Sequence, residues 1–347
     1  MRLLGLRLDV ESSVPAGMGV SSSASVEVAV LRAVSATFPP AEGGWDPLAP
    51  GPALELAHLA WLAETRVAGA PCGTMDQIAV SVGAPGCLLP ITCRPGEPGA
   101  PVPLPPGVTV LGWASGVQHD VGASPYRFAR TACFMAKRMA EAELERAGRF
   151  PAELAAVASG AAPRRLGWLS QLPLPFVQAF VAPLLPAAIT GKDFVARYGA
   201  VDDEASDVQP EAEYPVLAAL RFASGEDGRV RAATSVLRLV AAAAAAGAAD
   251  EAATEAAMRS VGELVSAAHG DYSALGLGCA ETDAIVHALT RELGPAAGVY
   301  GARVSGGGSG GTVAVLCRED AVAAIRALAA EPRFDFAGTG RPATIIV

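Results

Sequence analysis

The chain has 347 residues, of which 51% are hydrophobic and 18% are charged. This apolar content is enough to form a sizeable core, which excludes a wholly disordered protein. The formal net charge is −9, from 26 basic and 35 acidic residues. Because binding to nucleic acids and to anionic membranes depends on lysine and arginine, this charge argues against both as partners.

The sequence also argues against a membrane-spanning and against a secreted protein. The uncharged stretch 172–190 contains four prolines, which would repeatedly break a spanning helix. Arg7 and Asp9 interrupt the N-terminal residues, which therefore lack the apolar region of a signal peptide. The six cysteines are scattered, with no C-x-x-C pair and no histidine at metal-ligand spacing, so we expect reduced thiols. These features predict a cytoplasmic protein.

The first third of the chain predicts both strands and helices. Residues 4–10 alternate between apolar and polar side chains, which is typical of a strand. Apolar residues recur at helical spacing over 26–34 and 53–68, and both segments are predicted to be helices. Residues 86–91 and 108–112 are predicted strands, separated by a loop rich in proline and glycine.

The middle of the chain is predominantly helical by pattern. Residues 124–147 predict a long helix with Ser124 as its N-cap. Residues 150–270 continue the helical pattern, broken by proline clusters and by the acidic segment 202–213, which we expect to be a solvated loop. Residues 282–293 predict a further helix.

The last fifty residues again contain predicted strands. Residues 299–304 and 312–316 flank a glycine cluster as strand, turn and strand, and a helix over 320–330 precedes a short strand over 343–347. Strands in both halves of the chain, with helices between them, predict an α+β or a mixed α/β enzyme.

The first segment with recognisable chemistry is a glycine- and serine-rich motif between a predicted strand and a predicted helix. Glycines let a backbone approach a ligand closely, and a helix N-terminus offers unpaired N–H groups to a phosphate. Serine hydroxyls can bind phosphate oxygens or Mg²⁺. A glycine-rich turn with a serine N-cap explains the segment equally well. The motif consists of Pro15, Gly17, Gly19, Val20, Ser21, Ser22, Ser23 and Ala24.

The second segment contains two carboxylates, Glu64 and Asp76, on either side of a turn that includes Gly73. Such a turn can bring both groups to one site, where one holds a metal ion and the other accepts a substrate proton. The simpler alternative is that Asp76 is the N-cap of the helix that follows. The third segment, residues 306–311, has five glycines in six positions, which suits backbone packed against a ligand or a long flexible hairpin.

Taken in order, these segments resemble the motifs of the GHMP kinases, the superfamily of galacto-, homoserine, mevalonate and phosphomevalonate kinases. The resemblance covers residues 10–317, and it is strongest to the galactokinase-like and L-arabinokinase-like sugar kinases. The matching segments are VPAGMGVSSSASVEVA at 14–29, GAPCGTMDQ at 69–77, ASGVQHDVGASPYRFAR at 114–130, DYSALGLGCAETDAIV at 271–286 and YGARVSGGGSGGTVAVL at 300–316.

The resemblance implies a role for each matching residue. The serine loop would bind the ATP phosphates, with Ser23 also on Mg²⁺ and Glu64 as the second magnesium ligand. Asp76 would orient or deprotonate the anomeric hydroxyl of the sugar. Gly73, Tyr126 and Gly307 would contact the sugar. His119 and Arg127 belong to the same pattern, and for these two residues a structural hydrogen-bond network is favoured over a catalytic role.

The resemblance also implies a fold and a division into lobes. We expect a two-lobed α+β fold with an N-terminal lobe of the ribosomal protein S5 domain 2-like type over residues 1–115. A ferredoxin-like C-terminal lobe with extra helices would follow over residues 116–347. The family's first motif, which supplies an arginine and sugar-binding residues, is missing from this sequence. A late start codon, a natural split or degenerate protein, and a boundary chosen for expression are the three explanations that stay open.

The activity implied by the resemblance is transfer of a phosphoryl group from ATP to the anomeric (C1) hydroxyl of a monosaccharide. L-arabinose is the first substrate expected, and galactose or a uronic acid is the alternative. A hypothesis of another class is a non-catalytic sugar- or nucleotide-binding pseudo-kinase, because the first motif is missing. The expected partners are the sugar and ATP, with a monomer or homodimer as the assembly.

Overall fold

The computed structural model describes residues 6–38, 49–70, 72–94, 96–117, 125–151, 165–341 and 343–346. The chain forms two units, Met1–Pro103 and Leu104–Val347, which are described one at a time. These two units are separated by their internal contacts, whereas the predicted lobes 1–115 and 116–347 follow from the resemblance to a family. The division into lobes at residues 115 and 116 therefore stays a prediction.

Three helices that pack against one another form the first unit. Its helices are α1 (Ser22–Thr37), α2 (Pro50–Leu62) with a π-helical continuation η1 (Ala63–Val67), and α3 (Met75–Val82). Small side chains at helical spacing fill the interface of α2, where Ala53, Ala57 and Ala60 are buried. Alanines at such positions allow the helix axes to approach closely. Two short antiparallel pairs follow: β1 (Cys87–Leu88) with β4 (Val102–Pro103), and β2 (Ile91–Thr92) with β3 (Glu97–Pro98).

The strand predicted over residues 4–10 is wrong. The described part of this segment, from Leu6 onward, is in no strand, and Leu6, Leu8 and Val10 are exposed by 48%, 45% and 58%. Alternation is necessary for a half-buried strand, but a strand also needs a neighbour for its backbone hydrogen bonds. The segment pairs with no strand in the described residues.

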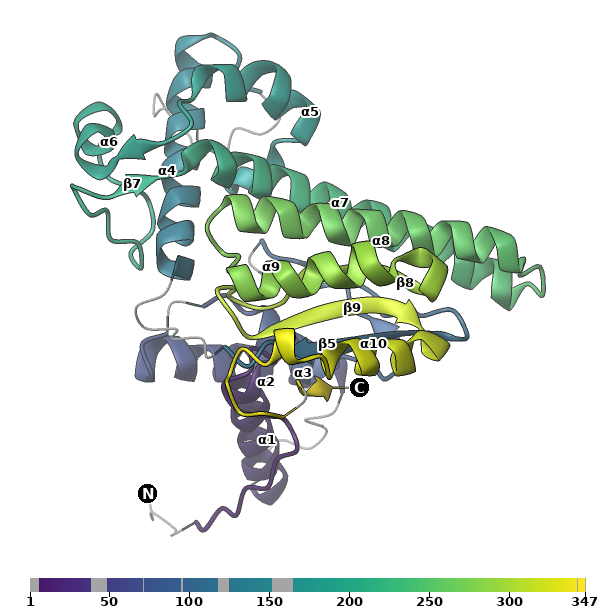
Figure 1. Ribbon diagram of the computed structural model, residues 1–347. Helices are drawn as coiled ribbons and strands as arrows, with labels where there is room; N and C mark the ends of the chain where they lie inside the picture. The colour runs from purple at the N-terminus through teal and green to yellow at the C-terminus, as the bar shows by residue number, and fades with distance from the viewer. Residues whose placement is uncertain are drawn as a thin grey trace. The chain divides into compact units, whose positions relative to one another are not determined.

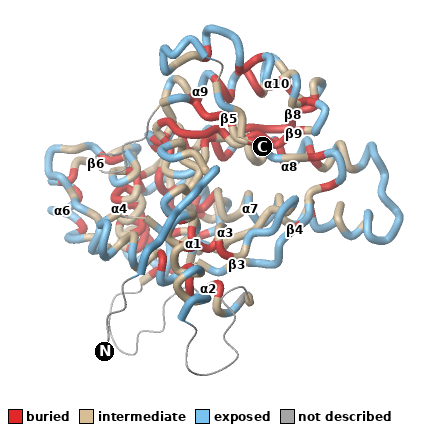
Figure 2. Tube along the Cα trace, turned by 90° about the horizontal axis from the view of Figure 1, so that it is seen from below, coloured by how far each residue is buried: buried red, intermediate tan, exposed pale blue. Residues whose placement is uncertain are grey.

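The second unit is built around a four-stranded antiparallel sheet of order β10-β5-β9-β8 (Figure 1). The strands are β5 (Val108–Ala114), β8 (Val299–Val304), β9 (Thr312–Arg318) and β10 (Ile345–Ile346). β5 and β9 pair along seven residues, from Val108 opposite Arg318 to Ala114 opposite Thr312. The buried residues of β8 and β9 appear as a red band in Figure 2.

One face of this sheet packs against α9 (Ala280–His287), its π-helical extension η6 (Ala288–Leu293) and α10 (Val322–Ala329). The core there includes Trp113 from the sheet and Ile325 from α10, both fully buried. The long helices α7 (Val216–Ala245) and α8 (Glu251–Ala274) lie side by side, and α8 contacts β8 (Figure 1). Gly262 of α8 permits this contact, because a Cβ atom there would meet the carbonyl oxygen of Tyr300 at 2.0 Å.

A second core surrounds the buried helix α4 (Pro125–Arg146). Short elements connect α4 to α7 and complete the unit. Between α4 and α7 lie η3 (Leu169–Gln171), α5 (Leu174–Phe176), η4 (Val177–Val181), η5 (Ala182–Leu184), β6 (Ile189–Thr190), α6 (Gly191–Tyr198) and β7 (Glu213–Tyr214). The short helices η7 (Pro295–Ala297), η8 (Glu319–Ala321) and η9 (Pro332–Phe334) come later in the chain. In the described part of the chain, no helix is long and apolar enough to cross a membrane.

Most predicted helices are confirmed with boundary shifts, and the predicted strand at 299–304 is confirmed without one. The prediction of an almost wholly helical middle is only partly right, because β6 and β7 pair there and 3-10 turns replace regular helix. The prolines of this region lack the backbone N–H that a continuous helix needs. Ser124, the expected N-cap of α4, lies outside the described residues.

Candidate active site

The serine loop leads into the N-terminus of α1 in the first unit. Gly17, Gly19 and Ser21 have positive φ angles of 73°, 69° and 60°, so left-handed residues alternate along the loop. Backbone N–H groups of such an alternating segment converge on a concavity that suits an anion, and a helix N-terminus adds its own N–H groups. Ala24, the third residue of α1, is fully buried and belongs to the core of this unit.

Ser21 occupies the N-cap position of α1, but its hydroxyl does not cap the helix. The hydroxyl instead donates a hydrogen bond to Asp76. A left-handed conformation costs a non-glycine residue about 1–2 kcal/mol, so its surroundings must hold Ser21 in place. The Ser21 carbonyl contributes, because it accepts hydrogen bonds from the N–H and from the hydroxyl of Ser25, both at 3.0 Å.

Glu64 reaches the same place from the π-helical turn η1. The Ala68 N–H bonds to the Ala63 carbonyl at 3.1 Å, five residues back, which is the π-helical pattern. Such turns occur frequently at functional sites. Glu64 Oε1 accepts a hydrogen bond from Ser23 Oγ at 2.8 Å, so the carboxylate meets the serine loop directly.

Asp76 is the second residue of α3, and the N-cap of that helix is Thr74. The alternative that Asp76 is an N-cap is therefore wrong. Burial raises the pKa of Asp76, the negative charge of Glu64 raises it further, and the hydrogen bond from Ser21 opposes both. Asp76 is thus a half-buried carboxyl group with a raised proton affinity, next to a second carboxylate.

Two further residues, Gln77 and Glu27, complete the cluster and were missed in the sequence. The Gln77 side chain is fully buried, and its Nε2 donates to Glu64 Oε2 and, at 3.4 Å, to Glu27 Oε2. Burial and the charge of Glu64 raise the pKa of Glu27, against the hydrogen bond from Gln77. Two signals could have found them: Glu27 lies one helical turn after Ser23, and Gln77 follows Asp76 directly.

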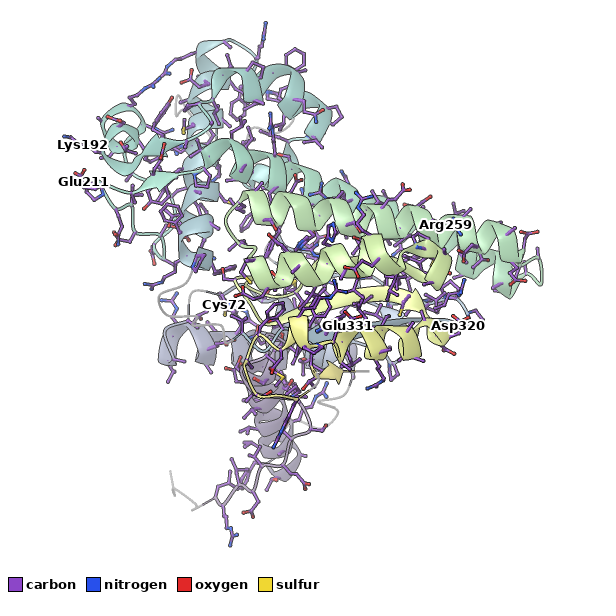
Figure 3. All side chains as sticks on the ribbon, in the orientation of Figure 1. Cys72, Lys192, Glu211, Arg259, Asp320 and Glu331 are labelled. Carbon is purple, nitrogen blue, oxygen red and sulfur yellow. The ribbon has the colours of Figure 1, made fainter. Side chains whose placement is uncertain are left out.

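Cys72 is the last member of this cluster and is labelled in Figure 3. It lies on the loop between η1 and α3, where its Sγ is 3.5 Å from Glu64 Oε2. Burial, followed by the charge of Glu64, raises its pKa to about 12, so it stays a thiol at neutral pH. Gly73 follows it in the same loop and is exposed.

Tyr126 and Gly307 belong to the second unit. Tyr126 lies in the first turn of α4, half-buried, with its hydroxyl hydrogen-bonded to Arg130, and Arg127 beside it is exposed. His119 lies outside the described residues. The neighbours of Gly307 are held tightly, since Tyr272 donates to the Gly306 carbonyl.

The glycine loop around Gly307 is not the flexible hairpin of the simpler interpretation. The Ser309 N–H donates to the Leu277 carbonyl at 2.7 Å, and the Gly311 N–H donates to the Val117 carbonyl at 3.1 Å. Gly308 has a φ of 76°, and a Cβ atom there would lie 2.3 Å from the Leu277 oxygen. The loop therefore needs glycine because it is packed against neighbouring backbone.

Two family models match the chain: the GHMP kinases N terminal domain at residues 1–84 and the GHMP kinases C terminal domain at residues 240–333. The chain belongs to the GHMP kinase superfamily. Curated sugar kinases are among the proteins to which it is similar. The expected α+β class and two-domain GHMP fold are confirmed.

The GHMP relatives are similar to this chain over different lengths. An L-arabinokinase of Arabidopsis thaliana is 32% identical over 97% of this chain and 32% of that protein. A galactokinase of Chloroflexus aggregans is 36% identical over 40% of this chain and 33% of that protein. This chain thus spans about a third of the length of the curated relatives that it matches.

A solved structure of galactokinase from Lactococcus lactis, complexed with galactose, has a similar fold. Its TM-score is 0.64 at 20% identity, covering 96% of this chain and 66% of that one. This similarity supports the GHMP fold alone.

GHMP kinases use ATP, and the family resemblance implies Mg²⁺ with it. Magnesium prefers oxygen ligands at 2.0–2.1 Å in octahedral geometry, so two adjacent ligands lie about 2.9 Å apart. Ser23 Oγ and Glu64 Oε1 are separated by 2.8 Å. The pair therefore fits one magnesium ion once the hydroxyl proton turns away.

Few protein ligands are expected at such a site, because Mg²⁺ usually keeps waters and binds substrate phosphates. Within the described ranges there is no group of three or more His, Cys, Asp or Glu side chains that could hold a metal ion by themselves. One carboxylate and one hydroxyl beside a loop that suits an anion are compatible with the donor set of a metal–nucleotide site.

Proposed function

We propose that this chain phosphorylates the anomeric C1 hydroxyl of a monosaccharide, with ATP as the phosphoryl donor and Mg²⁺ as the metal ion. The observation that carries the proposal is the meeting of three sequence segments in the first unit. Ser21 of the loop bonds to Asp76, while Ser23 of the same loop bonds to Glu64. Phosphoryl transfer needs these parts: a phosphate cradle, a metal ligand and a partner for the proton of the nucleophile.

In this proposal the loop from Pro15 to Ala24 binds the ATP phosphates through backbone N–H groups and serine hydroxyls. Ser23 and Glu64 hold Mg²⁺, which neutralises developing negative charge on the phosphates when it is bound. Gly73, Tyr126 and Gly307 contact the sugar. Residues 1–115 and 116–347 act as the two lobes, in a monomer or homodimer.

Asp76 accepts the proton of the attacking hydroxyl or orients that hydroxyl by a hydrogen bond. Its raised pKa suits this role, because a carboxylate with greater proton affinity is a better proton acceptor. Ser21 holds the carboxylate in place, so the phosphate loop and the proton acceptor are positioned by one residue.

L-arabinose is the first substrate that we propose, because the match to an L-arabinokinase extends over nearly the whole chain. D-galactose is the second candidate, supported by matches to galactokinases at 36% identity over a shorter region. The two sugars differ by one hydroxymethyl group, and discrimination on that scale depends on the shape of the pocket.

The test is an ADP-release assay with ATP, Mg²⁺ and, in turn, L-arabinose, D-galactose, D-galacturonic acid and D-glucuronic acid. We expect sugar-dependent release that Asp76→Asn lowers about 100-fold or more, with ATP binding retained. Asp193→Asn is the matched control, because Asp193 also lies in the first turn of a helix and accepts a hydroxyl hydrogen bond, from Thr190 at 2.8 Å.

Two outcomes would overturn the proposal. Full activity in Asp76→Asn would remove Asp76 from the reaction. Sugar binding by calorimetry without any ADP release, in a folded chain, would favour the non-catalytic binder instead.

A further inference from the structure

The acidic segment 202–213, expected to be a solvated loop, supplies an ion pair to the helix that carries Tyr126. Asp203 accepts two parallel hydrogen bonds from Arg130 of α4, from Nε at 2.9 Å and from Nη2 at 2.8 Å. The side chains of Arg130 and Asp203 are only 24% and 11% exposed. A two-point pair of this kind fixes the plane of the guanidinium group as well as its position.

Ser206 of the same segment holds both the carboxylate and the backbone carbonyl of Asp203. Ser206 donates its hydroxyl to Asp203 Oδ2 at 2.6 Å, and the Ser206 N–H bonds to the Asp203 carbonyl at 3.2 Å. Burial alone would raise the pKa of Asp203, but the hydrogen bonds from Arg130 and Ser206 outweigh it and the pKa is lowered. The pair therefore stays charged at neutral pH.

Arg130 connects this pair to Tyr126, which lies one helical turn earlier on α4. The two side chains are hydrogen-bonded, and because guanidinium groups only donate, the phenolic oxygen of Tyr126 is the acceptor. The bond therefore runs from the guanidinium to the phenolic oxygen, and the phenol also has an O–H group that can donate. The guanidinium carbon of Arg130 also lies over the ring of Phe134, 5.3 Å from its centroid.

We propose that Arg130 and Asp203 are positioning residues for Tyr126, so that the segment 202–206 sets the orientation of the phenol that contacts the sugar. This inference rests on the proposed function, in which Tyr126 is a sugar contact. A hydrogen bond from a cation polarises the phenol and strengthens its O–H as a donor to a sugar oxygen. Loss of the pair would therefore weaken sugar recognition and leave ATP recognition intact.

The chain contains a matched control for this pair. Lys137 of the same helix pairs with Asp202 of the same segment. That pair lies further along α4 than Arg130 and joins the same two elements. If the segment only stabilises the fold, both variants change stability and neither changes the KM for the sugar, whereas a positioning role makes that KM respond to Asp203.

The experiment compares Asp203→Asn with Asp202→Asn in steady-state kinetics. We expect Asp203→Asn to raise the KM for the sugar by roughly 5- to 30-fold, the effect of losing one charge-assisted hydrogen-bond network, with the KM for ATP unchanged. Asp202→Asn is expected to change neither constant. In a Tyr126→Phe background, Asp203→Asn should add no further loss, because its effect passes through the phenol.

A readout without turnover separates this inference from the proposed function. The chain has five tyrosines, so fluorotyrosine labelling gives a spectrum in which Tyr126→Phe assigns one resonance. We expect that resonance to shift in Asp203→Asn and not in Asp202→Asn, even if no sugar is phosphorylated. Equal effects of the two variants on KM, an additive loss in the double variant, or an unmoved resonance would each overturn the inference.

Discussion

Replacing Gln77 by methionine tests whether this amide organises the cluster of carboxylates in the first unit. The Gln77 side chain is fully buried, and its NH₂ group is shared between Glu64 and Glu27. Methionine has a similar length and volume, so the substitution removes the hydrogen-bond donor without opening a large cavity. Two neighbouring carboxylates would then face each other with no donor between them.

The size of the effect follows from three contributions. Loss of a hydrogen bond to the charged Glu64 costs about 1.5–3 kcal/mol, and the long bond to Glu27 adds little. The Gln77 carbonyl oxygen is buried without a hydrogen-bond partner among the described residues, so removing it returns about 1 kcal/mol. The free energy of unfolding should therefore fall by about 0.5–2 kcal/mol in total.

The assay is urea unfolding, with hydrogen exchange of residues 60–82 to localise the change. Ser81→Ala is the control, because the Ser81 hydroxyl is also buried on α3 and has no side-chain partner in the described part of the chain. Its removal should be neutral or slightly stabilising. Unchanged stability of Gln77→Met, or an equal loss in both variants, would refute the reasoning.

Two further predictions concern the second unit. Burial raises the pKa of Glu141 above its ordinary value of 4.5, so the contribution of this group to stability is present below pH 4.5 and is lost as the pH rises through the raised pKa. Between pH 4 and pH 7 in urea unfolding, the wild type should therefore lose more stability, or gain less, than Glu141→Gln, and an equal pH dependence of the two proteins would contradict this. Gly308→Ala should cost about 3 kcal/mol or more in thermal unfolding, because the new Cβ atom would clash with the Leu277 carbonyl. Gly338 has a φ of 64°, and a Cβ atom there would meet no atom within 4 Å, so Gly338→Ala should cost only about 1–2 kcal/mol. An equal loss of stability in the two variants would show that the positive φ, and not the clash with Leu277, determines the cost at Gly308.

Residues that belong to short sequence motifs can be predicted from the sequence alone. Ser23, Glu64 and Asp76 were predicted to share a site, and the structure brings them together. The helix over 22–37 and the strands around the glycine loop follow from periodicity and turn residues, which are local signals too. Local patterns suffice where neighbouring residues in the chain determine the conformation.

Sequence reasoning failed where the partner of a residue is distant in the chain. Asp203 looked like part of a solvated acidic loop, because nothing near it shows that Arg130, 73 residues earlier, takes it as an ion-pair partner. The alternation of residues 4–10 looked like a strand, because the pattern of one segment cannot show whether a neighbouring strand is present. Gln77 was overlooked for the same reason, since its two carboxylate partners come from α1 and η1.

The hydroxyl of Ser21 connects the fold to the proposed chemistry. A serine at the N-cap ordinarily bonds to a backbone N–H of its own helix, and this interaction stabilises a helix by about 1 kcal/mol. Here the hydroxyl bonds to Asp76 instead, and the N-terminus of α1 has no side-chain cap. The left-handed conformation of Ser21 adds a further cost. Because no side chain caps α1, its first N–H groups are available to an anion. A phosphate bound there would offset the stability that α1 loses through the missing cap and the left-handed Ser21.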